Sequence, residues 1–229
     1  MTVLTAIRAA ILRTTGVVVQ QAFASSDQIA VEMTDLANEV ATDIARSHDW
    51  RGITKIAQIT GTGAIEYDLP SDYHRMVLAS EIDDAASWFW GYEPFQSVND
   101  FMRFKSGTYS VISPGGWIIL GGQLQFYPAP NGVAQFPYVS TQWARSSGGV
   151  AKSAFTADDD EFVLDERLLT LGLIWRWMSQ KNLDYTEHLA TYEMALAQTQ
   201  ARDKGAYVLR TPVRRFGGLG TAYSGRPIG

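Results

Sequence analysis

One apolar stretch near the C-terminal third, Leu164–Met178, most limits how this chain can fold. Between residues 168 and 178 only Thr170, Gly172 and Arg176 are not large and apolar. A helix that is apolar nearly all round is buried on several sides, and Asp165 just before the run is a suitable N-cap. About 15 residues give a rod of roughly 22 Å, which is too short to cross a bilayer. The stretch therefore predicts the central helix of a helical core.

Three further segments show the spacing of amphipathic helices. Residues 2–13 carry apolar side chains at helical spacing, and Gly16 ends that segment. A helix is expected from Asp27 to Arg46, where apolar residues recur at steps of three and four. A last helix should begin at Asp184 and pack antiparallel on the central one. The apolar positions of these helices are Val3, Leu4, Ile7, Ala10 and Ile11; Ile29, Met33, Leu36, Val40 and Ile44; and Tyr185, Leu189, Tyr192 and Leu196.

The middle of the chain changes to the two-residue period of β-strands, and a β-rich connector is also expected at Val17–Phe23. Glycine pairs and Asn131-Gly132 supply turns, a short helix is expected at Val98–Lys105, and Pro137 predicts an edge strand or a bulge. Residues 53–143 thus predict a small antiparallel sandwich or open barrel. The expected strands are Ile53–Thr60, Ala64–Leu69, Arg75–Ile82, Tyr109–Ser113, Trp117–Leu120, Gln123–Tyr127 and residues 134–143.

The order of these elements predicts an α+β fold in which a helical bundle, built from N-terminal and C-terminal helices, is interrupted by an antiparallel β domain. The predicted helical domain takes residues 1–50 and 150–203, and the inserted β domain takes residues 51–149. Residues 204–229 lack periodicity and are rich in glycine, which predicts an extended C-terminal arm.

The charge is divided unevenly along the chain. Residues 204–229 carry five basic residues and no acid, so subtracting their +5 from the net charge of −5 leaves −10 for the remainder. A basic tail on an acidic body indicates a tail that docks on an acidic partner, and a solvated end is the alternative. The chain has no cysteine and no convincing signal peptide, and we expect a soluble protein made in a cytoplasm.

Residues suited to catalysis or metal binding are scattered. His48, His74 and His188 have no partner at metal-ligand spacing, and no nucleophile or phosphate-loop motif is present. The acidic run 158–161 fails the spacing of a calcium loop and is better explained as an acidic lead-in to the central helix. We therefore expect no catalytic site, no metal and no cofactor.

A row of four acids, Glu32, Asp35, Glu39 and Asp43, follows one stripe of the helix at residues 27–46. Such a row is usually a solvated face, and a metal site is an alternative. In a channel-forming assembly the row would line the lumen, where its negative charge would repel DNA phosphates.

An aromatic group at Trp88, Trp90, Tyr92 and Phe95 leaves two interpretations open. Core or subunit-interface packing is one. The other is a stacking platform, formed by Trp88, Trp90 and Tyr92, for glycans or peptides on a β module carried by a helical stalk.

Several short segments, in a fixed order across residues 25–203, together resemble the head–tail connector, or adaptor, proteins of tailed bacteriophages and related gene-transfer particles. The segments that carry this resemblance are Leu36-Ala37-Asn38-Glu39, Ser47-His48-Asp49-Trp50, residues 67–73, residues 121–130, Phe155-Thr156-Ala157-Asp158, residues 164–166, residues 168–177 and Lys181-Asn182-Leu183-Asp184-Tyr185.

The resemblance implies a structural virion protein and no enzyme. It implies a ring of about twelve copies below the portal protein, at the neck between capsid and tail, assembled in the host cytoplasm. The ring would extend the DNA channel, meet the next neck or tail protein, and touch double-stranded DNA only in transit and without sequence preference. No membrane contact is implied. Arms of such adaptors dock on the portal, which assigns that role here to Arg210, Arg214, Arg215 and Phe216.

Overall fold

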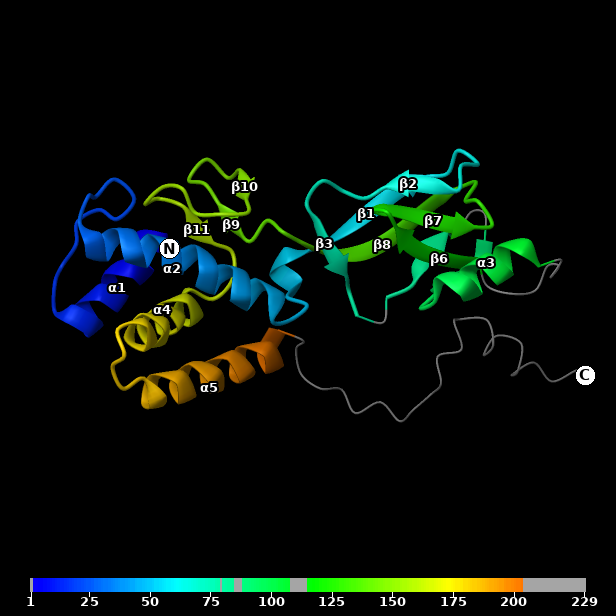
Figure 1. Cartoon of the computed structure of the whole chain (residues 1–229). Helices are drawn as coiled ribbons and strands as arrows, with labels where there is room; N and C mark the ends of the chain where they lie inside the picture. The colour runs from blue at the N-terminus through cyan, green and yellow to red at the C-terminus, as the bar shows by residue number, and fades with distance from the viewer. Residues whose placement is uncertain (1, 79, 85–87, 108–114, 204–229) are drawn as a thin grey trace, which may run out of the picture. The chain divides into compact units, whose positions relative to one another are not determined.

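The computed structural model describes residues 2–78, 80–84, 88–107 and 115–203, and for residues 84 and 88–90 only the backbone (Figure 1). The expected Tyr109–Ser113 strand and the C-terminal arm lie outside the described residues. Within them the chain is a mixed α+β protein. Its helices are α1 (Val3–Thr15), α2 (Gln28–Arg46), the 3₁₀ turn η1 (Arg51–Ile53), α3 (Val98–Ser106), α4 (Glu166–Gln180) and α5 (Thr186–Asp203).

Eleven strands are present among the described residues. They are β1 (Thr54–Thr60), β2 (Glu66–Asp68), β3 (Tyr73–Met76), β4 (Ile82–Asp84), β5 (Trp88–Pro94), β6 (Gly115–Leu120), β7 (Gln123–Tyr127), β8 (Val133–Ser140), β9 (Ala144–Arg145), β10 (Ala151–Lys152) and β11 (Glu161–Phe162).

The described residues divide into two compact units. The first contains residues within 2–57, 70–80 and 137–203, and the second contains residues within 58–69 and 81–136. Residues 70–80 and 137–149, which the predicted boundaries place in the inserted β domain, cluster with the helices. Strands β1 and β8 each begin in one unit and end in the other.

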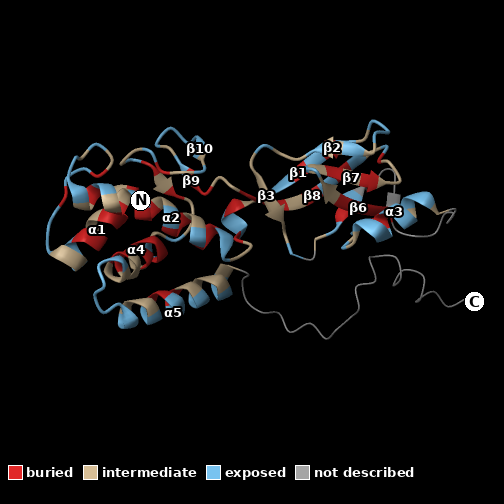
Figure 2. Cartoon of the chain, viewed as in Figure 1, coloured by how far each residue is buried: buried red, intermediate tan, exposed pale blue. Residues whose placement is uncertain are grey.

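The four long helices bury their apolar faces in the first unit. α4 has the expected N-cap, because the Asp165 carboxylate accepts a hydrogen bond from the Arg167 amide at 2.8 Å. α1 and α2 contribute the apolar positions expected from their spacing, although Leu4 and Ile29 are only partly buried. The buried residues appear as red stripes on α1, α2 and α4 in Figure 2. The predicted positions of these helices are confirmed.

The contact between α2 and α4 is close enough to require a glycine. A Cβ built on Gly172 would lie 2.4 Å from the Val40 Cγ1 and 3.4 Å from the Tyr192 ring of α5. Gly172 therefore lets α4 approach α2 more closely than any residue with a side chain allows.

A small three-stranded sheet, in the order β10-β9-β11, completes the core of the first unit. Trp143, Phe155 and Phe162 are buried in edge-to-face contacts with ring centroids 4.9–6.0 Å apart. Edge-to-face packing places the positive edge of one ring on the negative face of the next, and it buries apolar surface as well. The aromatic side chains therefore join the small sheet to the helices.

The remaining strands form one large, nearly closed sheet in the order β1-β8-β4-β5-β6-β7-β2, with β3 paired to β8. The prediction of a purely antiparallel domain is wrong, because β5 and β6 pair in parallel with Tyr92 opposite Gly115. A parallel pair needs a crossover connection, and α3 lies in the connection between these two strands. Phe101 of α3 is buried, and its ring lies 5.7 Å from that of Phe95.

Three local predictions are corrected by the pairing. Val17–Phe23 forms no strand, because its backbone is bound by side chains instead: Arg8 donates to the Val19 carbonyl at 2.7 Å. The single strand expected at residues 75–82 is two strands, β3 and β4, separated by a turn.

β8 is not an edge strand, since β1 lies on one side and β4 and β3 on the other. Pro137 lies where the partner of β8 changes from β4, at Gln135, to β3, at Tyr138.

Candidate functional site

The acidic row of α2 faces cations from α4 and the turn that follows it. Glu32 lies 2.8 Å from the Lys181 ammonium, and the Arg176 guanidinium lies 2.6 Å from Asp43 and 3.6 Å from Glu39. Asp35 is exposed and has no hydrogen bond or ion pair with any described residue. Four carboxylates against these two cations and Arg46, at the end of α2, leave this face net negative.

The two cations are themselves held over aromatic rings of α4. The Arg176 guanidinium lies 4.6 Å from the centre of the Trp175 ring, and the Lys181 ammonium lies 5.8 Å from that of Trp177. Both distances suit cation–π attraction. The hydrogen bond from Lys181 also lowers the pKa of Glu32, against the opposing effect of burial. The acidic row is therefore a face that ties α2 to α4.

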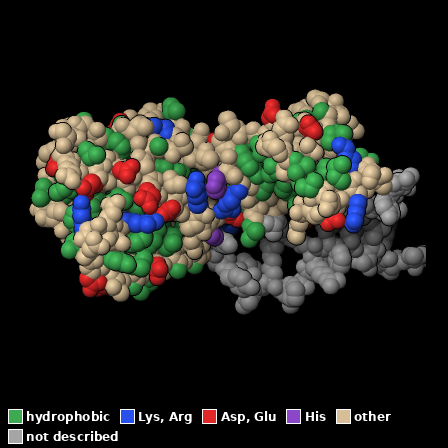
Figure 3. Space-filling view, in the orientation of Figure 1, with side chains coloured by type: hydrophobic (Ala, Val, Ile, Leu, Met, Phe, Trp, Pro, Cys, Tyr) green, Lys and Arg blue, Asp and Glu red, His purple; other side chains and the backbone are tan. Residues whose placement is uncertain are grey.

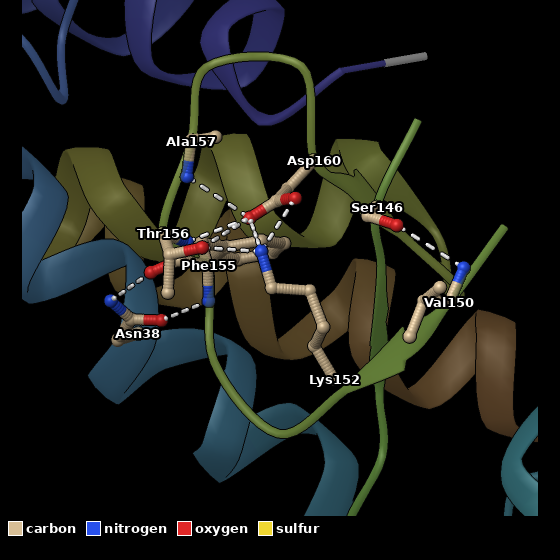
Figure 4. Close-up of polar contacts among 8 residues, drawn as sticks. All are labelled: Asn38, Ser146, Val150, Lys152, Phe155, Thr156, Ala157 and Asp160. Atoms are coloured by element: carbon tan, nitrogen blue, oxygen red, sulfur yellow. Dashed lines mark hydrogen bonds and ion pairs between the residues drawn. The ribbon is translucent and has the colours of Figure 1, made fainter. Parts of the chain in front are cut away.

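The acidic run at residues 158–161 anchors loops. Asp160 is only 1% exposed, and its carboxylate binds the Lys152 ammonium at 2.6 Å and the amides of Thr156 and Ala157 at 2.7 and 3.0 Å (Figure 4). These partners lower the pKa of Asp160 although burial alone would raise it. A buried carboxylate with one ammonium and two amides is fully paired.

Asn38 of α2 binds the same loop from the other side. Its carboxamide oxygen accepts from the Phe155 amide at 2.7 Å and its nitrogen donates to the Phe155 carbonyl at 3.3 Å (Figure 4). The Asn38 side chain thus binds both the backbone amide and the backbone carbonyl of Phe155, which lies outside any helix or strand. It fixes the loop between β10 and β11 on the surface of α2.

The N-terminal segment is also attached to the acidic run. The Asp158 carboxylate accepts from the amides of Ala22 and Phe23, each at 3.0 Å. The Val3 amide donates to the Asp160 carbonyl at 2.7 Å. These bonds support the interpretation of the run as structural. No group of three or more potential metal ligands occurs among the described residues.

The three histidines are not brought together. His48 packs on Trp50 and lies 3.9 Å from Asp203, His74 lies on β3, and His188 is on α5. In the part of the chain that the structure describes, none forms a nucleophile–base pair or a ligand set with the others.

Tyr92, one of the three residues of the candidate glycan-stacking platform, is buried. Tyr92 is 1% exposed, and its ring packs against Phe126 with centroids 5.0 Å apart. It is therefore a core residue of the second unit and is not available to a ligand. The side chains of Trp88 and Trp90 lie outside the described part of the chain.

Acids on the strands of the second unit have structural partners. The Gln125 amide donates to Glu66 at 3.0 Å, and the Gln123 amide donates to Asp68 at 2.9 Å, both between β7 and β2. They are cross-strand pairs of the ordinary kind. The residues predicted to bind the portal, Arg210, Arg214, Arg215 and Phe216, lie outside the described residues.

Comparison with known families decides the class of protein. A sequence model of the SU10 adaptor protein family matches residues 1–215. The chain belongs to this family. The match confirms the resemblance to phage head–tail adaptors and extends it, since it includes α1 and reaches Arg215, beyond the 25–203 range of the recognised segments. No curated protein matches the chain significantly.

Family membership gives this adaptor a structural role in a bacteriophage and points to the virion. A structural adaptor family also points to a protein that is not an enzyme. No helix among the described residues is long and apolar enough to cross a membrane.

Proposed function

We propose that this SU10 adaptor family member forms a ring of about twelve copies beneath the portal protein, joining capsid to tail and extending the DNA channel. Membership of the adaptor family is the observation that carries the proposal. The ring would sit at the virion neck, assemble in the host cytoplasm, meet the next neck or tail protein below, and pass double-stranded DNA without reading its sequence.

The C-terminal arm is the proposed portal-binding element. Arg210, Arg214 and Arg215 supply guanidinium groups that bind carboxylates in a bidentate manner, and Phe216 supplies an apolar anchor. The uneven charge supports this assignment, because the arm is basic while the rest of the chain carries −10. An arm that becomes ordered on its partner covers a large surface for its length.

The acidic row of α2 is the proposed DNA-facing surface. Asp35 is exposed, and Arg176 and Lys181 offset only part of the negative charge of the row, so it would repel DNA phosphates. Repulsion would keep the genome from adhering to the channel during ejection. Each ring would present one such face per subunit.

Light scattering on a sizing column tests the ring and its portal contact together. The purified chain is measured alone and after mixing with the portal ring. We expect the chain to join the portal at about one copy per portal subunit. A chain that never joins the portal, at any ratio, contradicts the proposal.

A second sample tests the arm. Replacing Arg210, Arg214 and Arg215 by alanine should abolish portal attachment and leave folding unchanged. Alanine at Arg13, Arg167 and Arg202, three exposed arginines of the first unit, is the matched control for lost charge. Portal binding by the arm variant at elevated salt would show that the arm is not the docking element.

A further inference from the structure

A cavity of about 320 Å³ opens on the first unit beside the C-terminal end of α2. A cavity needs only about 10–15 Å³ to hold one water molecule, so this one has room for a side-chain carboxylate. Polar side chains from α2, β3 and the segment after β8 meet around it. Its lining includes Thr42, Arg46, His74, Thr141, Trp143 and Ser153.

Among the described residues, the cavity wall contains one guanidinium, that of Arg46, which is not held in an ion pair. Arg46 is exposed, and no hydrogen bond or ion pair with a described residue engages its guanidinium. Arg75, the neighbour of His74 on β3, is bound to Asp49. Figure 3 shows Lys or Arg and His side chains gathered near the C-terminal end of α2 and β3.

The pKa of His74 is sensitive to the positive charges around the cavity. Burial lowers the pKa of His74, and the nearby charges of Arg46 and Arg75 lower it further. No hydrogen bond from a described residue occupies its ring nitrogens. An anion placed between Arg46 and His74 would be attracted by both groups. The hydroxyls of Thr42, Ser140 and Thr141 already donate within the protein, which leaves the Ser153 hydroxyl as the donor at the cavity wall.

We propose that this cavity binds the carboxylate side chain of an acidic protein partner, with Arg46 as the charged contact and His74 as the second donor. Arginine suits this role because its planar guanidinium matches a carboxylate bidentately. Trp143, Val139 and Ala45 form the apolar part of the wall, against which the methylene groups of a glutamate would pack.

The surroundings of the cavity favour a protein carboxylate over a DNA phosphate. A second hollow that shares Thr42 and Arg46 is lined by Asp35, Glu39 and Asp43. DNA brings a continuous row of phosphates, and these acids would repel the neighbours of any phosphate that entered. A single carboxylate on a protein surface enters the cavity without a second charge alongside it.

Titration of the full chain with a blocked peptide that carries a single glutamate among uncharged residues, followed by NMR of the His74 imidazole, tests the proposal. The variant is Arg46→Gln and the matched control is Arg13→Gln, because each arginine is in the last turn of its helix. We expect the peptide to move the His74 resonances and to raise the pKa of His74. Binding should weaken at least tenfold in Arg46→Gln and less than twofold in Arg13→Gln.

Equal weakening in the two variants would overturn the proposal, as it would show attraction to overall charge only. Unmoved His74 resonances would also overturn it. A short DNA duplex measured in parallel overturns the choice of partner if it displaces the peptide from His74. The measurement needs no portal and no ring, so it can fail while the proposed adaptor function stands.

Discussion

Asp72 is a carboxylate bound by three side-chain donors. It accepts hydrogen bonds from the Lys55 ammonium at 2.6 Å, the Ser140 hydroxyl at 2.7 Å and the Tyr138 hydroxyl at 2.8 Å. Burial alone would raise the pKa of Asp72, but these donors lower it to about 2. Burial and the Asp72 carboxylate together raise the pKa of Tyr138 to about 12. Asp72 thus holds the start of β3 to β8 and β1.

Replacing Asp72 by asparagine should make stability less dependent on acid pH. The pKa of about 2 in the folded state lies below the ordinary value of 3.8, so the ionised carboxylate stabilises the fold above about pH 4. This contribution is on the order of 2 kcal/mol at pH 7, falls to roughly half at pH 3, and is lost near pH 2. Urea unfolding of wild type and Asp72→Asn at pH 7 and pH 3 measures the difference.

The exposed, unpaired Asp35 provides the control for that measurement. Asp35→Asn should change the free energy of unfolding by less than about 0.5 kcal/mol at either pH. The difference in free energy of unfolding between wild type and Asp72→Asn should be smaller at pH 3 than at pH 7. An equal difference at the two pH values would mean that the donors do not act on the charged form of Asp72.

Several residues in the segments that resemble the adaptor family have the same structural role. Asn38, Asp49, Asp72 and Asp158 lie in the recognised segments, and each accepts hydrogen bonds that fix a loop or a strand end. Sequence reasoning identified the segments but not these roles. Their partners are 17 to 136 residues away along the chain, so no local pattern could reveal them.

At the scale of elements, the crossing of α2 and α4 depends on the absence of a side chain. Gly172→Ala should destabilise the protein by about 1–3 kcal/mol. Alanine favours a helix by up to about 1 kcal/mol, but its Cβ would meet Val40, whose branched side chain has little freedom to move in a helix. Chemical denaturation measures the loss.

Gly148→Ala is the control for the glycine substitution, because a Cβ there meets only the Ser146 hydroxyl at 3.8 Å. Adding Val40→Ala to Gly172→Ala should restore part of the stability, since the smaller residue makes room. A Gly172→Ala protein as stable as wild type would mean that α4 can shift away from α2 at no cost.

The loop between β10 and β11 should loosen when Asp160 is replaced. Asp160→Asn removes the ion pair with Lys152 and weakens the acceptor for the Thr156 and Ala157 amides. We expect a loss of about 1–3 kcal/mol and faster hydrogen exchange at those two amides, about tenfold for each 1.4 kcal/mol. Asp159→Asn, at an exposed neighbour, should leave both unchanged. Equal protection in the two variants would contradict the anchoring role.

Helices were predictable at this scale and strand pairing was not. The apolar spacing of α1, α2, α4 and α5 is a local signal, and their positions agree with the structure. The parallel pairing of β5 with β6, and the interior place of β8 despite Pro137, depend on which strands meet in space. The residues of a strand do not specify by themselves which other strands it pairs with in the sheet.

At the scale of the whole molecule, the basic arm should be separable from folding. Every described helix and strand ends by Asp203, so removing residues 204–229 should shift the thermal midpoint by less than about 2 °C. The same deletion should abolish portal binding and leave a body of net charge −10. Circular dichroism and the sizing-column assay check the two parts. A truncated chain that unfolds on its own would mean that the arm belongs to the core.

The candidate site was partly predictable on this scale. The distribution of charge along the chain predicted the basic arm, and the helical spacing of four acids predicted the acidic row. The cations opposite the row were missed, because Arg176 and Lys181 lie more than 130 positions from Asp43 and Glu32. The cavity at Arg46 was missed for the same reason.

The attachment of the N-terminal segment to residues 158–161 has a consequence for synthesis. The start of α1 and the connector after it are bound by backbone and carboxylate groups that leave the ribosome more than 130 residues later. We expect the apolar faces of α1 and α2 to remain uncovered on the nascent chain until α4 emerges. Such surfaces attract chaperones and other unfinished chains, so the moment at which they are covered in the cell should be set by the synthesis of the last third of the chain.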